Sequence, residues 1–110
     1  MKSLCLFMAL AVTTTQAFSQ PDDAESRELY EATSHYMAAV GLDPYNKSDR
    51  QRITNDGERV TQNVVNGAGC VIKTNLYIND HLDELPAAQS VVFSFFSKVC
   101  FARLKREGKM

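Results

Sequence analysis

Several features that define common protein classes are scarce or missing in this sequence of 110 residues. Charges nearly cancel, with 12 Lys and Arg against 13 Asp and Glu, so the chain lacks the basic footprint of a nucleic-acid-binding protein. Only two histidines are present, His35 and His81, and the acids are scattered at no ligand spacing, which indicates neither a metal site nor a base positioned beside a cysteine nucleophile. We expect no cofactor, no metal, no catalytic residue and no nucleic-acid partner.

Long apolar runs are also rare, and the longest one lies at the start of the chain. Lys2 precedes an apolar run from Leu4 to Val12, followed by a polar stretch with small residues near Ala17 and Ser19. This order is typical of a secretory signal peptide, and the run is too short to span a bilayer. We predict a signal peptide over residues 1–19, a single secreted domain over 20–110, and no membrane partner.

Cysteine is the third scarce residue type. Of the three cysteines, Cys5 would leave with the signal peptide, so Cys70 and Cys100 remain. In an oxidising compartment an even pair favours one disulfide over two free thiols or a metal site. A domain of about 90 residues buries a modest fraction of its unfolded surface, and a covalent link would stabilise it.

The first periodic segment after the signal peptide predicts a helix. Residues 26–40 place apolar side chains near a helical period, and Gly41 can close the helix in a left-handed conformation. The next segment, 41–51, is interpreted as a loop because Asp43-Pro44 disfavours further helix. It contains Asn46-Lys47-Ser48, an acceptor sequence that would be glycosylated in a secreted eukaryotic protein and is usually without meaning in a bacterial one.

The remaining segments predict strands. Residues 52–65 are rich in Thr and Val, and Gly57 marks either a bulge, which we favour, or a separate turn. Asn66-Gly67 is the strongest short-range signal for a type I′ hairpin, since both residues tolerate positive φ. The alternating segment 70–78 follows as the returning strand, and the apolar run 91–96 suits a buried strand.

A loop over residues 80–89, with room for a turn of helix, separates the last two strands. One helix followed by several strands predicts an α+β fold, in which an N-terminal helix packs across an antiparallel β-sheet.

The hairpin and its flanking segments resemble the cystatins, a family of reversible inhibitors of papain-like cysteine proteases. The family motif Gln-x-Val-x-Gly is matched by Asn63, Val65 and Gly67, with Asn in place of Gln, and "VCFARLK" is similar to the segment that leads to the second binding hairpin of the family. The resemblance covers about residues 25–78. It implies a cystatin-like fold and a hairpin tip that blocks the cleft of a papain-like protease through Asn63, Val64, Val65, Asn66 and Gly67.

The sequence departs from the cystatin pattern at three places. It has no glycine in the lead after the signal peptide, no Trp and hence no Pro-Trp after the last strand, and one cysteine pair where the family has two disulfides. The first two departures favour an alternative: a non-inhibitory secreted binding module that engages a hydrophobic ligand or a protein partner. Three phenylalanines within 91–96 could line an apolar pocket or a dimer seam instead of a core strand. The basic end "RLKREGK" is interpreted as a solvated chain end.

Overall fold

The computed structural model describes residues 24–110, and this part of the chain is helical. Its elements are α2 (Ala24–Ala39), α3 (Lys47–Val60), α4 (Gly67–Asp80), the short 3₁₀ helix η1 (Leu82–Glu84) and α5 (Gln89–Arg106). No strand occurs between residues 24 and 110. The predicted α+β fold with an antiparallel sheet is therefore wrong, and the predicted signal peptide lies outside the described residues.

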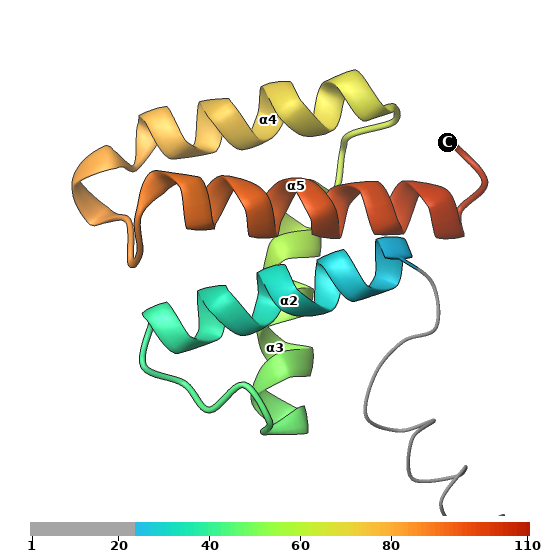
Figure 1. Cartoon of the computed structure of the whole chain (residues 1–110). Helices are drawn as coiled ribbons and strands as arrows, with labels where there is room; N and C mark the ends of the chain where they lie inside the picture. The colour runs from blue at the N-terminus through green and yellow to red at the C-terminus, as the bar shows by residue number, and fades with distance from the viewer. Residues whose placement is uncertain (1–23) are drawn as a thin grey trace, which may run out of the picture.

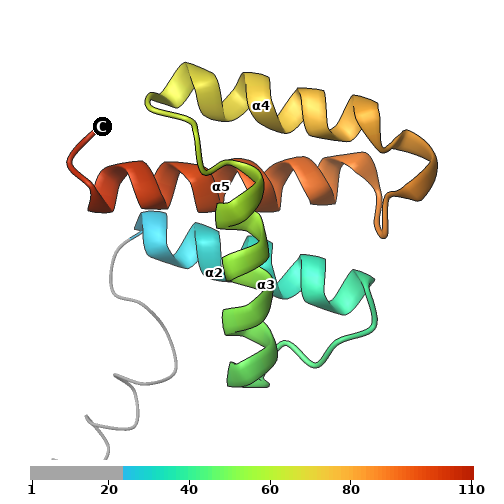
Figure 2. The same cartoon turned by 180° about the vertical axis from the view of Figure 1, so that it is seen from behind.

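The four α-helices form two layers. Helices α2 and α4 lie on opposite sides of α5 and run along it (Figure 1), while α3 crosses one face of this layer steeply (Figure 2). Helix α5 packs against each of the other three, and α2 also packs against α3. Helix α5 is thus the central element.

The predicted N-terminal helix is confirmed with a shift of one or two residues at each end. Gly41 has a φ of 85°, its N–H bonds to the Ala38 carbonyl at 3.1 Å, and the Leu42 N–H bonds to the Met37 carbonyl at 2.8 Å. This is the Schellman arrangement that satisfies the last carbonyls of a helix. Gly108, with a φ of 75°, ends α5 in the same way.

Both asparagines that we assigned to loops or turns are helix caps. Asn46 accepts a hydrogen bond from the Asp49 N–H at 2.9 Å, and Asn66 accepts one from the Gly69 N–H at 2.8 Å. An asparagine in extended conformation satisfies a helix N-terminus in this way. The predicted loop 41–51 therefore ends early, at Asn46.

The predicted hairpin turn at 66–67 is wrong for the same reason. Asn66 has an extended backbone, Gly67 is the first residue of α4, and the only positive φ angles among residues 24–110 belong to Gly41 and Gly108. The strand predicted over 52–65 is mostly α3, and Gly57 is not a bulge but a buried helical residue: a Cβ atom there would lie 3.3 Å from Val99 Cγ1.

Two further predicted strands are helices. Residues 70–78 lie inside α4, and residues 91–96 lie inside α5. The loop predicted over 80–89 is confirmed in outline, with η1 as its turn of helix.

Helix α5 contributes to two separate apolar clusters. The larger one, which we call the aromatic core, gathers side chains from all four helices: Tyr36, Met37, Ile53, Ile78, Val92, Phe95, Phe96 and Val99. The smaller one, the stapled core, contains Val64, Cys70, Cys100 and Leu104. The predicted disulfide between Cys70 and Cys100 is confirmed in the stapled core, with a Cα–Cα distance of 5.7 Å.

Candidate functional site: the groove between α2 and α5

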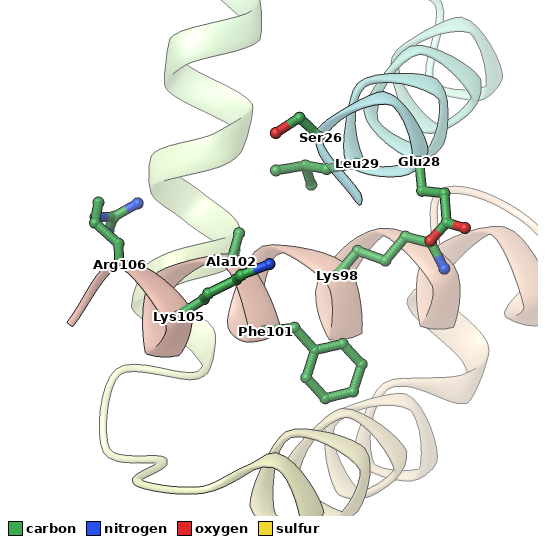
Figure 3. Close-up of a pocket in the computed structure, with 8 residues that line it drawn as sticks. All are labelled: Ser26, Glu28, Leu29, Lys98, Phe101, Ala102, Lys105 and Arg106. Carbon is green, nitrogen blue, oxygen red and sulfur yellow. The ribbon is translucent and has the colours of Figure 1, made fainter. Parts of the chain in front are cut away.

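A groove of about 320 Å³ lies between the first turns of α2 and the second half of α5. The side chains from α5 recur at intervals of three and four residues, which places them on one face of that helix. Ligand pockets begin at about this size, near 300 Å³. The groove is drawn in Figure 3 and is lined by Ser26, Glu28 and Leu29 from α2 and by Lys98, Phe101, Ala102, Lys105 and Arg106 from α5.

The groove combines an apolar surface with a charged rim. Leu29, Phe101 and Ala102 supply carbon surface, and the aliphatic stems of the lysines add to it. Phe101 points toward α4, where it also packs against the stapled core (Figure 3). One side of the groove is thereby fixed by the disulfide-linked part of the fold.

Among the described side chains, cations outnumber carboxylates around the groove. Three cations, Lys98, Lys105 and Arg106, line it together with one described acid, Glu28, and Lys98 extends toward that carboxylate (Figure 3). Arg106 also reaches α3, since its Nη2 lies 3.1 Å from Glu58 Oε2 in a largely exposed ion pair. The excess of positive charge gives the groove a preference for anionic groups.

Helix geometry strengthens this preference on the α2 side. The first turn of α2 borders the groove, and helix N-termini present backbone N–H groups and the positive end of the macrodipole. Two of the three cations that line the groove, Lys105 and Arg106, lie in the last turn of α5. Cations are stabilised in the last turn of a helix, so Lys105 and Arg106 also suit the end of α5.

Arg103, next to the groove in sequence, is not part of its rim. It is only 7% exposed, and its Nη2 donates to the carbonyls of Thr61 at 2.8 Å and Val64 at 2.9 Å, while Nη1 donates to Glu107 Oε1 at 2.9 Å. This guanidinium fastens the α3–α4 connection onto α5. The interpretation of "RLKREGK" as a solvated chain end is therefore wrong for Arg103.

Glu107 completes the charge arrangement at the end of α5. The pKa of this carboxyl lies below its ordinary value, first because Lys109 donates a hydrogen bond to it and second because the charge of Arg103 is close. The carboxylate form is thus favoured beside two cations.

The residues predicted to bind a protease lie in and around the α3–α4 connection, not on a hairpin. Asn63 is exposed, Val64 is buried in the stapled core, and Val65 is exposed by 63%. Asn66 caps α4 and Gly67 begins it. The five residues are consecutive in the sequence, and none of them lines the groove.

The other candidates from the sequence lie apart from the groove. His35 is exposed on α2, and the ring of His81 stacks on Tyr77 with its Nδ1 2.8 Å from the Tyr77 carbonyl oxygen. Phe95 and Phe96 are buried in the aromatic core and are not among the residues that line this groove. Among residues 24–110 no group of three His, Cys, Asp or Glu side chains is placed to hold a metal ion.

A second hollow helps to define what distinguishes the groove. It has a volume of about 520 Å³ but lies along α3 alone, and only polar side chains line it: Ser48, Gln51, Arg52, Asn55, Asp56 and Arg59. No apolar side chain lines it, so it lacks the combination of apolar side chains and cations that the groove has. None of the helices in the described part of the chain has the length and apolar character to cross a membrane.

No family model matches this chain, and neither does any curated protein or solved structure with which it was compared.

Proposed function

We propose that this chain is a secreted, non-enzymatic binding protein whose α2–α5 groove takes a small anionic amphiphile, that is, a molecule with a short hydrocarbon part and a negatively charged head. The observation that carries this proposal is the combination, in one groove, of apolar surface from Leu29, Phe101 and Ala102 with an excess of cations. Secretion rests on the predicted signal peptide over residues 1–19.

Each part of the ligand has a counterpart in the groove. The hydrocarbon part would replace water on the carbon surface of Phe101 and Leu29, and burial of apolar area is the main source of binding free energy. The head would lie beside Lys98, where it competes with Glu28 for the ammonium group. Arg106 can contribute as well, since its exposed pair with Glu58 is of the kind that stabilises by about 0 to 1 kcal/mol and is readily exchanged.

Calorimetric titration of the purified protein with decanoate below its micellar concentration tests the proposal. We expect saturable binding at one site, weaker binding of decanol, and no binding of decyltrimethylammonium, because only the first combines the hydrocarbon with a negative head. Equal binding of all three would overturn the anionic part of the proposal, and no binding of decanoate would overturn the whole.

Substitutions in the rim locate the site. Lys98→Glu should weaken decanoate binding by about tenfold or more, whereas Glu28→Gln should strengthen it, because the carboxylate that competes for Lys98 is gone. Lys73→Glu is the matched control, since Lys73 is exposed on α4, on the other side of α5. If Lys73→Glu weakens binding as much as Lys98→Glu, the effect is one of net charge and not of this groove.

A second pair of variants tests the apolar surface without any change of charge. Ala102→Phe would fill part of the groove and should abolish binding, whereas Ala68→Phe places the same side chain at an exposed position of α4 and should leave binding unchanged. Retained binding in Ala102→Phe would place the ligand elsewhere.

Inhibition of papain-like proteases is the second candidate function. One observation favours it: Val65 is 63% exposed on a connection that is held at both ends, by the bond from Arg103 to the Val64 carbonyl and by the Asn66 cap. A connection ordered before binding loses little conformational entropy in a protease cleft. Titration of papain with the protein should then show a reversible loss of protease activity, and Val65→Asp should remove this inhibition. Val71→Asp, at an exposed position of α4, is the control and should inhibit as the parent does. Absence of inhibition by the parent protein would exclude this function.

A further inference from the structure

The corner between α2 and α3 presents an acceptor sequence to solvent. Asn46, Lys47 and Ser48 are all exposed, and the neighbouring Tyr45 is 83% exposed. A bulky group attached at this corner would displace no packed side chain.

The carboxamide of Asn46 makes a hydrogen bond through its oxygen and not through its nitrogen in the described part of the chain. Its Oδ1 accepts the capping hydrogen bond from the Asp49 N–H, and within residues 24–110 nothing accepts a hydrogen bond from its Nδ2. A substituent on Nδ2 leaves the carbonyl oxygen of the amide in place. The cap of α3 and a modification of Nδ2 are therefore compatible.

We infer that Asn46 is the attachment site of an N-linked oligosaccharide. In the glycosylation reaction, Nδ2 of Asn46 attacks C1 of an oligosaccharide that is linked to a polyprenyl pyrophosphate. An N–C bond forms, the bond between C1 and the pyrophosphate oxygen breaks, one amide proton is released, and the polyprenyl pyrophosphate leaves. The inference rests on the proposed secretion and on a eukaryotic source, because the transfer takes place in the secretory pathway of eukaryotic cells, and it is independent of the ligand groove.

The position of Asn46 keeps the oligosaccharide away from the groove. The groove borders the first turns of α2, and Asn46 follows the other end of that helix (Figure 1). A helix of 16 residues is about 24 Å long. The glycosylated protein should therefore bind decanoate as the unmodified protein does.

The capping role of Asn46 determines which variants give a clean test. Asn46→Gln removes the acceptor and also the short side chain that caps α3, so any effect on stability would be ambiguous. Ser48→Ala removes the acceptor sequence and leaves the cap. Asn46→Asp removes the acceptor and keeps a capping oxygen, and it is the same residue that enzymatic removal of the glycan by a peptide-N-glycosidase would leave. Ser48→Thr retains the acceptor sequence.

Translation of the full chain with endoplasmic-reticulum microsomes tests the inference. We expect the parent and Ser48→Thr to gain the mass of one glycosidase-sensitive oligosaccharide, and Ser48→Ala and Asn46→Asp to gain none. A chain that is protected from added protease inside the microsomes but unmodified overturns the modification alone. A chain that stays outside overturns both the modification and secretion. Neither result bears on the groove, which is tested on protein without glycan.

Discussion

The aromatic core and the stapled core both lie on α5, but they are held together in different ways. In the aromatic core the Tyr36 ring stacks on Phe95 with ring centroids 4.5 Å apart, and Phe96 packs against both at 5.9 and 5.3 Å. The stapled core has no aromatic side chain among its buried residues and depends on a disulfide and on the hydrogen bonds of Arg103. The aromatic core is thus stabilised by the burial of apolar area, and the stapled core by a disulfide and hydrogen bonds.

The sequence of α5 explains the difference. Its first half, from Val91 to Val99, supplies apolar residues to α2, α3 and α4 at once. From Lys98 onward the helix also contains the three cations that line the groove, Lys98, Lys105 and Arg106. Where a helix face serves a charged groove, less apolar area is left for a core, and covalent and polar links take over the stabilising role.

The largest effect on stability is expected in the aromatic core. Phe95 is fully buried, and Phe95→Ala should lower the free energy of unfolding by about 3 to 5 kcal/mol, because transfer and cavity terms add. Phe93→Ala, at a partly buried position of the same helix, should cost clearly less. Urea unfolding measures both, and Phe95→Leu serves if the alanine variant does not fold. Equal losses for Phe95 and Phe93 would contradict the central place of Phe95.

Loss of the disulfide should come next. Cys70 and Cys100 are fully buried and 30 residues apart, so removal of the link by replacing both with Ala should cost about 3 to 4 kcal/mol through the entropy of the unfolded chain. Hydrogen exchange sharpens the comparison. Protection should fall most in α4 and least in α2, which belongs to the aromatic core; a uniform loss would mean that the two cores are one cooperative unit.

The polar link of the stapled core should contribute somewhat less than the disulfide. Arg103→Met keeps the length of the side chain but takes the donor from the Val64 carbonyl and one donor from Thr61, and we expect a loss of about 2 to 3 kcal/mol. Arg106→Met is the control: it removes an exposed pair with Glu58 and should change stability by less than about 1 kcal/mol. Thermal unfolding compares the two, and a similar loss in both would show that the buried position of Arg103 is without consequence.

Helix α4 shows why the sequence predicted strands. Its buried residues Cys70, Thr74 and Ile78 are four apart, and every helical spacing of four is also a multiple of the strand period of two. The residues between them complete the alternation, but Ile72 and Leu76 are 59% and 53% exposed. Because these two apolar residues lie on the solvent face, the sequence pattern of the helix resembles that of a strand, and only tertiary packing reveals which face is buried.

The features that we predicted correctly have sequence signals with one structural interpretation, and those that we missed have signals with two. Gly41 ends a helix that was already periodic, and one cysteine pair allows one disulfide. Asn66-Gly67 suits a hairpin turn and also a capped helix start, since Asn serves both. The groove was not predicted, because it depends on how α2 and α5 pack along each other; its only signal was the basic end of the chain.

Two glycines give a smaller effect that separates the two interpretations of the α3–α4 region. Gly57→Val should destabilise by about 1 to 3 kcal/mol, because its added carbons meet Val99 and Phe95 in the aromatic core. Gly67→Val should cost less than about 1 kcal/mol, since a Cβ there meets only Met110 and Phe101 at 3.5 Å or more and φ is not positive. Chemical unfolding of both variants tests this. A large loss for Gly67→Val, as in a hairpin with positive φ, would contradict the helical start of α4.

The smallest expected effect on the free energy of unfolding comes from the Tyr36 hydroxyl in the aromatic core, and it appears only at alkaline pH. Burial raises the pKa of Tyr36 above its ordinary value of 10.0, and the neighbouring Tyr77 and Asp56 raise it further. Above pH 10 the unfolded chain releases the phenolic proton more readily than the folded protein does, so the folded state binds more protons and stability falls as the pH rises. The contribution is fully present below pH 10 and is lost on going up through the raised pKa. Urea unfolding of the parent and of Tyr36→Phe between pH 9 and 11 measures it, because the two proteins differ only in the Tyr36 hydroxyl. The parent should lose stability more steeply than Tyr36→Phe above pH 10, and parallel curves would mean that the Tyr36 hydroxyl is as well solvated in the folded protein as in the unfolded chain.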